Sequence, residues 1–207
     1  MKNEKYLSDI SEIKNMMNKS SRFISLSGLS GILAGVYALI GAWFAYRTIY
    51  FDNATMGSYQ TLVISYEAVV KLFIIAASVI ILSIITGLVL SVRKANKANE
   101  KLWNPTSKRL LINFLIPLAT GGFFILFLIE KEMLSIIAPL MLIFYGLACL
   151  NASKYTFGDV RYLGITLILL GLVSTWFLGY GLLFWALGFG VCHIVYGSLM
   201  YFKYDRN

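Results

Sequence analysis

The sequence predicts an all-α membrane protein, a bundle of six transmembrane helices, and three observations support this. Of its 207 residues, 58% are hydrophobic and only 14% are charged, whereas soluble domains are about half apolar and about a quarter charged. The apolar residues fall into six stretches, each close to the ~20 residues that a helix needs to cross the hydrocarbon core. Lys and Arg gather in the loops between alternate stretches. Six such spans leave no room for a separate soluble domain.

The predicted organisation is a cytoplasmic amphipathic N-terminal segment followed by one membrane domain. Residues 1–22 are polar, but Ile10, Ile13 and Met17 would share one face of a helix. We expect this helix to lie at the membrane interface; docking to a cytoplasmic partner is the alternative. The membrane domain covers residues 23–203, with spans at about 23–46, 71–92, 110–129, 133–150, 162–178 and 182–202.

The distribution of positive charge predicts the orientation. The N-terminal segment, the second and fourth loops and the C-terminus hold 15 Lys and Arg residues, and the three opposite loops hold 3. Cytoplasmic loops carry the excess of positive residues, so both termini should be cytoplasmic. The net charge of +8 then points to the lipid bilayer, with anionic headgroups at the cytoplasmic face as partners, and not to nucleic acid.

Small residues predict where two helices pack closely. In the first span they recur at steps of three and four, and in the last span they lie on one stripe. Small residues on one face of a transmembrane helix let the backbone of a neighbour approach closely. The predicted close-packing seam comprises Gly28, Gly31, Gly35, Gly190 and Gly197.

His193 is the only histidine and lies near the middle of the last span. On an α-helix it shares the stripe of Gly190 and Gly197, so it should point into the bundle. An ionisable residue inside a membrane is by default a candidate functional residue. The structural alternative is a neutral imidazole bonded to a carbonyl or a tyrosine, and both interpretations stay open. Thr120, at a similar depth, or a tyrosine such as Tyr37 is the expected partner.

The third span contains the other predicted polar feature. Asn113, Pro117 and Thr120 lie on one helical face, and Pro117 cannot donate to the carbonyl of Asn113. A weakened polar face inside a membrane needs partners or water. His193, Thr120, Asn113 and Tyr37 therefore form the predicted polar cluster.

The residues argue against an enzyme. Cys149 and Cys192 lie inside apolar spans without C-x-x-C spacing, and the sequence contains no P-loop and no H-E-x-x-H motif. A haem held by two histidines would need a second histidine. Rhomboid proteases share the six spans but need a Gly-x-Ser-Gly nucleophile where this chain has Tyr-Gly-Leu-Ala-Cys. We expect no catalytic residues, no metal and no cofactor.

The opening SSRFISLSGLSGILAG and the last two spans, YLG…GYGLLFWALGFGVCHIVYG, resemble a family of six-helix bacterial inner-membrane proteins without a known activity. The resemblance implies the fold and no chemistry. We expect a non-enzymatic structural, regulatory or partner-binding component with a membrane or cytoplasmic protein partner. The alternative is a small-solute or proton-coupled transporter that uses His193 and the face of Asn113, Pro117 and Thr120.

Overall fold

The computed structural model describes residues 6, 23, 25–50, 66–99 and 101–206, and these residues form helices and short connections without any strand. The predicted N-terminal amphipathic helix lies outside the described residues apart from Tyr6. Six helical segments are long and apolar enough to cross a membrane, as the prediction of an all-α protein requires. In chain order the elements are α2 (Gly28–Tyr50), α3 (Tyr66–Lys97), α4 (Pro105–Glu130), η1 (Leu134–Ile136), α5 (Ile137–Ala152), η2 (Ser153–Tyr155), α6 (Asp159–Trp176), α7 (Gly181–Trp185), η3 (Ala186–Cys192), α8 (His193–Met200) and η4 (Tyr201–Asp205).

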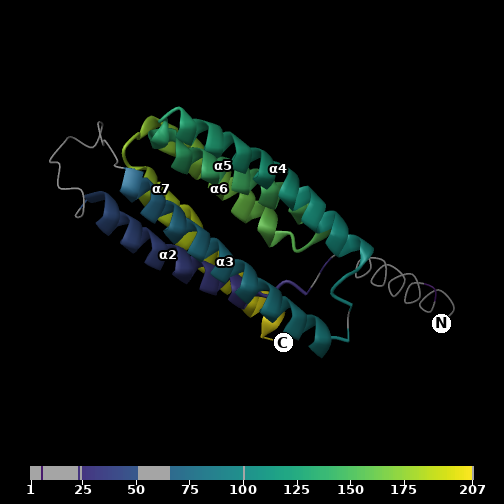
Figure 1. Cartoon of the computed structure of the whole chain (residues 1–207). Coiled ribbons are helices and arrows are strands. Elements are labelled where there is room, and N and C mark those ends of the chain that lie inside the picture. The colour runs from purple at the N-terminus through teal and green to yellow at the C-terminus, as the bar shows by residue number, and fades with distance from the viewer. Residues whose placement is uncertain (1–5, 7–22, 24, 51–65, 100, 207) are drawn as a thin grey trace.

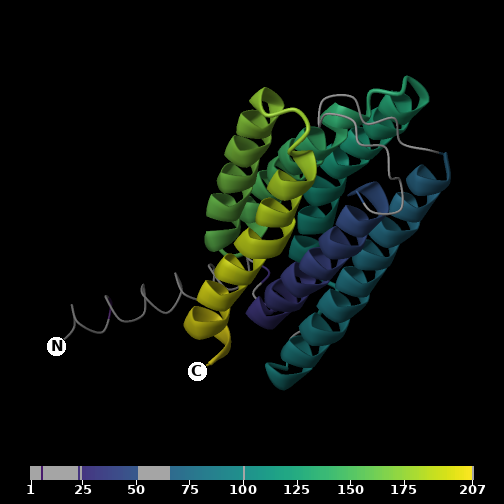
Figure 2. The same ribbon diagram turned by 90° about the vertical axis from the view of Figure 1, so that its left-hand side faces the viewer.

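The helices form two layers that the last helix joins (Figure 1). One layer is α2 packed along α3, and the other contains α4, α5 and α6, with α5 in the middle. The continuous helix α7–η3–α8 packs along α2 and also contacts α5 and α6 (Figure 2). The first and last described helices are therefore neighbours, and α3 has extended contacts with α2 alone.

Local sequence explains several helix ends. Asn104 caps α4 through a capping box: its side chain accepts from the amide of Ser107, whose hydroxyl accepts from the amide of Asn104, and Pro105 follows at the first helical position. Gly179 has a φ of 98°, which costs glycine little, and this residue allows the short turn between α6 and α7. The helix α2 begins at Gly28, later than the predicted start at about residue 23, and residues 25–27 before it are not helical.

One end of the bundle collects most of the positive charge. Here α2 begins, α3 ends, α4 begins and the C-terminal residues lie (Figure 1). We call it the basic end. Ten of the described Lys and Arg residues belong to it, and three belong to the opposite end. The ten are Arg93, Lys94, Lys97, Lys101, Lys108, Arg109, Lys154, Arg161, Lys203 and Arg206.

Ser174 provides a first prediction. It is fully buried in α6, and its Oγ has no hydrogen-bond partner among the described residues. An unsatisfied buried hydroxyl costs about 1–3 kcal/mol. We therefore expect Ser174→Ala to raise the free energy of unfolding by about 1 kcal/mol, measured by thermal unfolding in detergent. Ser107→Ala, which removes half of the capping box, is the control and should lower it. A lower melting temperature for Ser174→Ala would show that the hydroxyl has a partner.

Candidate functional site

The predicted small residues of the first and last helices face each other. A Cβ added to Gly197 would lie 2.6 Å from the amide nitrogen of Ile32 and 2.9 Å from the carbonyl oxygen of Gly28. A Cβ added to Gly35 would lie 2.6 Å from the carbonyl oxygen of Gly190. These separations are below any normal Cβ contact, so the two backbones touch. The contact fixes the last helix against α2 and thereby positions His193.

The last helix is not a regular α-helix around His193. Residues Ala186–Cys192 form a π-helical segment, whose wider turns advance each residue less around the axis. Gly190 and Gly197 face α2, but the ring of His193 is directed to α5. His193 begins the regular helix α8, so it stays one α-helical turn from Gly197; its carbonyl lies near Gly31 of α2 while its ring reaches α5. Such π segments occur often at functional sites.

Both ring nitrogens of His193 are hydrogen-bonded. Nδ1 lies 3.0 Å from the carbonyl oxygen of Gly188, and Nε2 lies 3.0 Å from the hydroxyl of Tyr145 on α5. A carbonyl can only accept, so Nδ1 carries the proton and donates to Gly188. In the neutral ring Nε2 is then the acceptor, and Tyr145 donates to it. The side chain is buried, with 7% of the residue exposed.

Aromatic rings and a thiol surround this pair. The ring of Phe189 stacks on His193 at 5.9 Å between centroids and meets Tyr145 at 5.0 Å, while Phe114 of α4 packs edge-on against Tyr145. Cys149 lies one turn further along α5 and is buried. The site is an apolar compartment in which a short chain of hydrogen bonds joins α5 to the last helix.

His193 bonds a tyrosine and a carbonyl, as the structural alternative expects, but the named candidates Thr120 and Tyr37 do not bond it. On α4, Thr120 is exposed and donates to the carbonyl of Ile116, four residues earlier in the same helix. Asn113 is half-buried and donates in the same way to the carbonyl of Arg109. Tyr37 instead bonds Thr86 of α3 at 3.2 Å. Helical phase gives the face on which Thr120 lies, but the depth of a residue does not determine which helix lies beside it. Pro117 lies within α4, which runs unbroken from Pro105 to Glu130.

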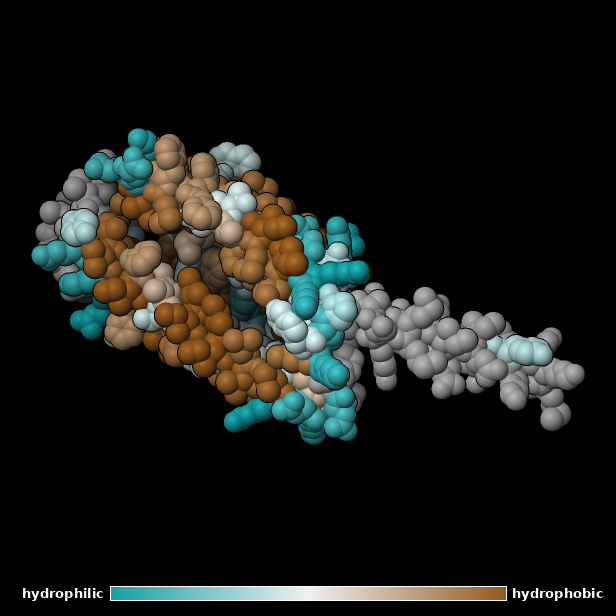
Figure 3. Space-filling view, turned by 45° about the vertical axis from the view of Figure 1, so that its right-hand side comes forward, coloured by the Kyte–Doolittle hydropathy of each residue, from teal (hydrophilic) through white to brown (hydrophobic). Residues whose placement is uncertain are grey.

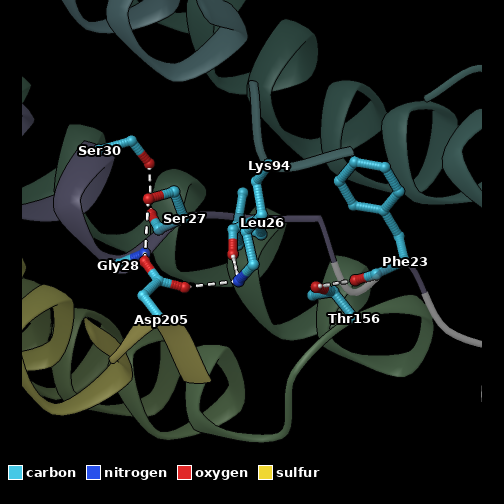
Figure 4. Close-up of polar contacts among 8 residues, drawn as sticks. All are labelled: Phe23, Leu26, Ser27, Gly28, Ser30, Lys94, Thr156 and Asp205. Carbon is cyan, nitrogen blue, oxygen red and sulfur yellow. Dashed lines mark hydrogen bonds and ion pairs between the residues drawn. The ribbon is translucent and has the colours of Figure 1, made fainter. Parts of the chain in front are cut away.

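A second polar cluster, which the sequence did not predict, lies at the basic end and is drawn in Figure 4. The Asp205 carboxylate accepts from the Ser27 hydroxyl at 2.9 Å and from the Gly28 amide at 2.8 Å. Its other oxygen pairs with the Lys94 ammonium, which also donates to the Leu26 carbonyl at 2.9 Å. The Asp205 side chain is 11% exposed. A carboxylate from the end of the chain thus caps the N-terminus of α2.

Further bonds tie the same region to the connection between α5 and α6. The amide of Phe23 donates to the carbonyl of Tyr155 at 2.7 Å. The Thr156 hydroxyl donates to the carbonyl of Phe23 at 2.8 Å, as Figure 4 shows. Tyr204 donates to the Asp159 carboxylate at 2.7 Å and Lys203 pairs with the same group. Hydrogen bonds and ion pairs between segments far apart in the sequence therefore hold the basic end together.

One signal in the sequence could have pointed to Asp205. The first turn of α2 contains no acidic residue, although its N-terminus attracts negative charge. Asp205 is the only acidic residue after Asp159. A helix N-terminus without an acidic residue and a single acidic residue on the same side of the bundle suggest that the two pair. This inference requires knowing that the start of α2 and the C-terminal residues lie at the same end of the bundle.

The described residues contain no group of three His, Cys, Asp or Glu side chains close enough to share a metal ion. The hydrogen bonds of Tyr145 and Gly188 to His193 can position the imidazole, and neither of them joins the ring to a carboxylate of the described residues. Comparison with protein-family models, with curated proteins and with solved structures finds no match to this chain.

Proposed function

We propose that this chain is a multi-pass protein of the bacterial inner membrane with a non-enzymatic role, a structural or regulatory component that acts by binding partners. The six long apolar helices support the membrane location. The role rests on one observation, the closed environment of His193. Both nitrogens of the ring are bonded inside the protein, to Gly188 and Tyr145, and the residue is buried.

A proton or solute pathway would need a different environment. A relay through His193 requires a nitrogen that exchanges protons with water or with a neighbouring acid. Among the described residues, the neighbours of the ring are aromatic rings and helix backbone. Two further pairs of polar side chains bond across helices, Tyr37 with Thr86 and Thr166 with Tyr196. This pairing favours a role in helix packing.

The transporter remains the second candidate because a π-helical segment adjoins His193 and such segments are frequent at functional sites. The face of Asn113, Pro117 and Thr120 gives it no support, since the side chains of Asn113 and Thr120 bond their own helix and do not reach His193.

The orientation that we propose places both termini in the cytoplasm, because the basic end holds the larger share of positive charge. We expect single cysteines at Asn99 and Glu132, in a variant with Cys149 and Cys192 replaced by alanine, to react with a membrane-impermeant maleimide from opposite sides. Whole cells should label only Glu132→Cys, and inverted vesicles only Asn99→Cys. Labelling of both from one side would contradict the membrane proposal.

Variants of His193 test the proposed role. We expect His193→Gln to keep a hydrogen bond and a melting temperature near that of the parent. His193→Leu leaves the Tyr145 hydroxyl and the Gly188 carbonyl without this partner and should lower the free energy of unfolding by about 1–3 kcal/mol. In vesicles with an internal pH dye, the parent protein should pass no more protons than empty vesicles do.

Tyr145→Phe is the matched control, because it removes one of the two bonds and should lie between the parent and His193→Leu in stability. Proton flux that depends on the parent protein and disappears in stably folded His193→Gln would contradict the packing role and support the transporter.

A further inference from the structure

Three of the described helices carry the same pairing of an aromatic ring and a basic residue close to their C-terminal ends. In each pair the cation lies between 5.4 and 5.8 Å from the centroid of the ring. The cation also follows the ring by four residues in the sequence, so it lies about one turn nearer the end of the helix. The three pairs, which we call the ring–cation pairs, are Trp43 with Arg47 on α2, Phe127 with Lys131 on α4 and Phe202 with Arg206 on the last helix.

Each ring–cation pair continues an exposed apolar face of its helix. The three rings are more than half exposed, and the three cations are exposed as well. About one turn before each ring, the helix presents a further apolar side chain that is more than half exposed. These side chains are Ile40, Phe123 and Leu199. Along each helix the order is therefore apolar side chain, aromatic ring and cation, which fits the boundary between an apolar phase and water.

The ring–cation pairs lie at both ends of the bundle. Helices α2 and α4 begin at the basic end, so their pairs lie at the opposite end, whereas the last helix ends at the basic end (Figure 1). Figure 3 shows a broad hydrophobic surface with hydrophilic residues gathered at its two ends. The pairs therefore occur where the surface changes from hydrophobic to hydrophilic.

Helix α4 gives the distance between the two ends. Lys108 lies at the basic end, where its ammonium is 5.6 Å from the centroid of the Trp103 ring. Phe127 follows Lys108 by 19 residues in the same unbroken helix, which corresponds to a rise of about 29 Å. The hydrocarbon core of a bilayer is about 30 Å thick, so the two ends match the two headgroup layers of one bilayer.

We propose that the ring–cation pairs hold the protein at the two phospholipid headgroup layers. Each ring lies at the edge of the hydrocarbon, and each cation reaches the lipid phosphates. The inference rests on the proposed membrane location and adds the residues that bind the surface of the bilayer. Aromatic rings and long basic side chains near the ends of transmembrane helices are suited to this level. One protein docked at one end would not reach pairs at both ends, whereas lipid surrounds the whole bundle.

Fluorescence quenching by spin-labelled lipids tests this proposal. In the full chain the native tryptophans are replaced by phenylalanine, and each variant then holds a single tryptophan, either the native Trp43 or a new one in Phe127→Trp or Phe202→Trp. In phosphatidylcholine vesicles, a nitroxide on the headgroup should quench all three about twofold more strongly than a nitroxide near the end of an acyl chain. Ile81→Trp is the matched control, because Ile81 is exposed near the middle of α3, and it should show the reverse order.

The cation is tested in the variant that keeps only Trp43. Arg47→Gln removes the charge that holds the ring near the headgroups, so the preference for the headgroup label should fall by about half. Arg47→Lys keeps a cation and should keep the preference. An unchanged preference in Arg47→Gln would show that the ring alone sets the depth and would overturn the pair as the anchor.

Two other results would overturn the proposal, namely stronger quenching by the acyl-chain label at the three sites, or quenching of these sites by aqueous iodide alone. The control distinguishes the failures: if Ile81→Trp is quenched by the acyl-chain label in either case, the membrane location stands and only the anchoring fails. If the background without native tryptophans does not fold, nitroxides on single cysteines at positions 43, 127 and 202 replace it, with Cys149 and Cys192 changed to alanine. Their accessibility to oxygen and to a nickel chelate measures the same depths.

Discussion

Gly197→Leu is expected to destabilise the protein more than any other substitution proposed for it, with a loss of about 3 kcal/mol or more. The new side chain would meet backbone on the opposite helix, the Ile32 amide nitrogen at 2.6 Å and the Gly28 carbonyl oxygen at 2.9 Å from its Cβ. Backbone in the middle of a packed helix cannot rotate away as a flexible side chain can. The measurement is the melting temperature in detergent, together with the fraction of monodisperse protein.

Gly122→Leu is the matched control for this change. Gly122 also lies inside a helix, but a Cβ there would meet nothing within 4 Å. Leucine has a higher helix propensity than glycine, so this variant should be as stable as the parent or slightly more stable. Equal melting temperatures for Gly197→Leu and the parent would mean that α2 and the last helix do not touch.

Asp205→Ala should have the second largest effect, a loss of about 2–3 kcal/mol. It removes two hydrogen bonds at the start of α2 and leaves the partly buried Lys94 ammonium without its counter-ion. Asp205→Asn keeps an acceptor for Ser27 and Gly28 but loses the charge, so its loss should be smaller. Thermal unfolding and amide hydrogen exchange at the start of α2 are the measurements.

Glu130→Gln serves as the control, because the pair of Glu130 and Lys131 is largely exposed and such pairs contribute about 0–1 kcal/mol. If Asp205→Ala melts like Glu130→Gln, the carboxylate does not stabilise the N-terminus of α2.

The positions of the helices could be predicted because each is long, apolar and bounded by polar residues. The glycines at positions 28, 31 and 35 also indicated a close contact, since few other arrangements account for small residues at that spacing. A tyrosine or a carbonyl as the partner of His193 could be predicted, but the particular tyrosine could not. Helical phase gives the face of a residue, and only the packing of α5 against the last helix places Tyr145 beside the ring.

The π-helical segment was not predicted either, because no residue type between Ala186 and Cys192 marks a change of helical period. Asp205 was not predicted as a cap because its partners are about 110 and 177 residues away, and no local pattern reports such a distance.

The cap that Asp205 places on α2 has a consequence for the order of assembly. Helix α2 is made first among the described helices, yet both its N-terminal cap and its closest backbone contact come from the last helix. Until that helix has been synthesised, the start of α2 lacks its carboxylate and its glycine face has no permanent neighbour. Of the described helices made before the last one, α3 alone has extended contacts with α2. Contacts with such a large separation in the sequence form late. The membrane bundle should therefore become resistant to proteolysis in one step, when the last helix docks. In a chain cut before Asp205, the start of α2 should stay sensitive to proteolysis.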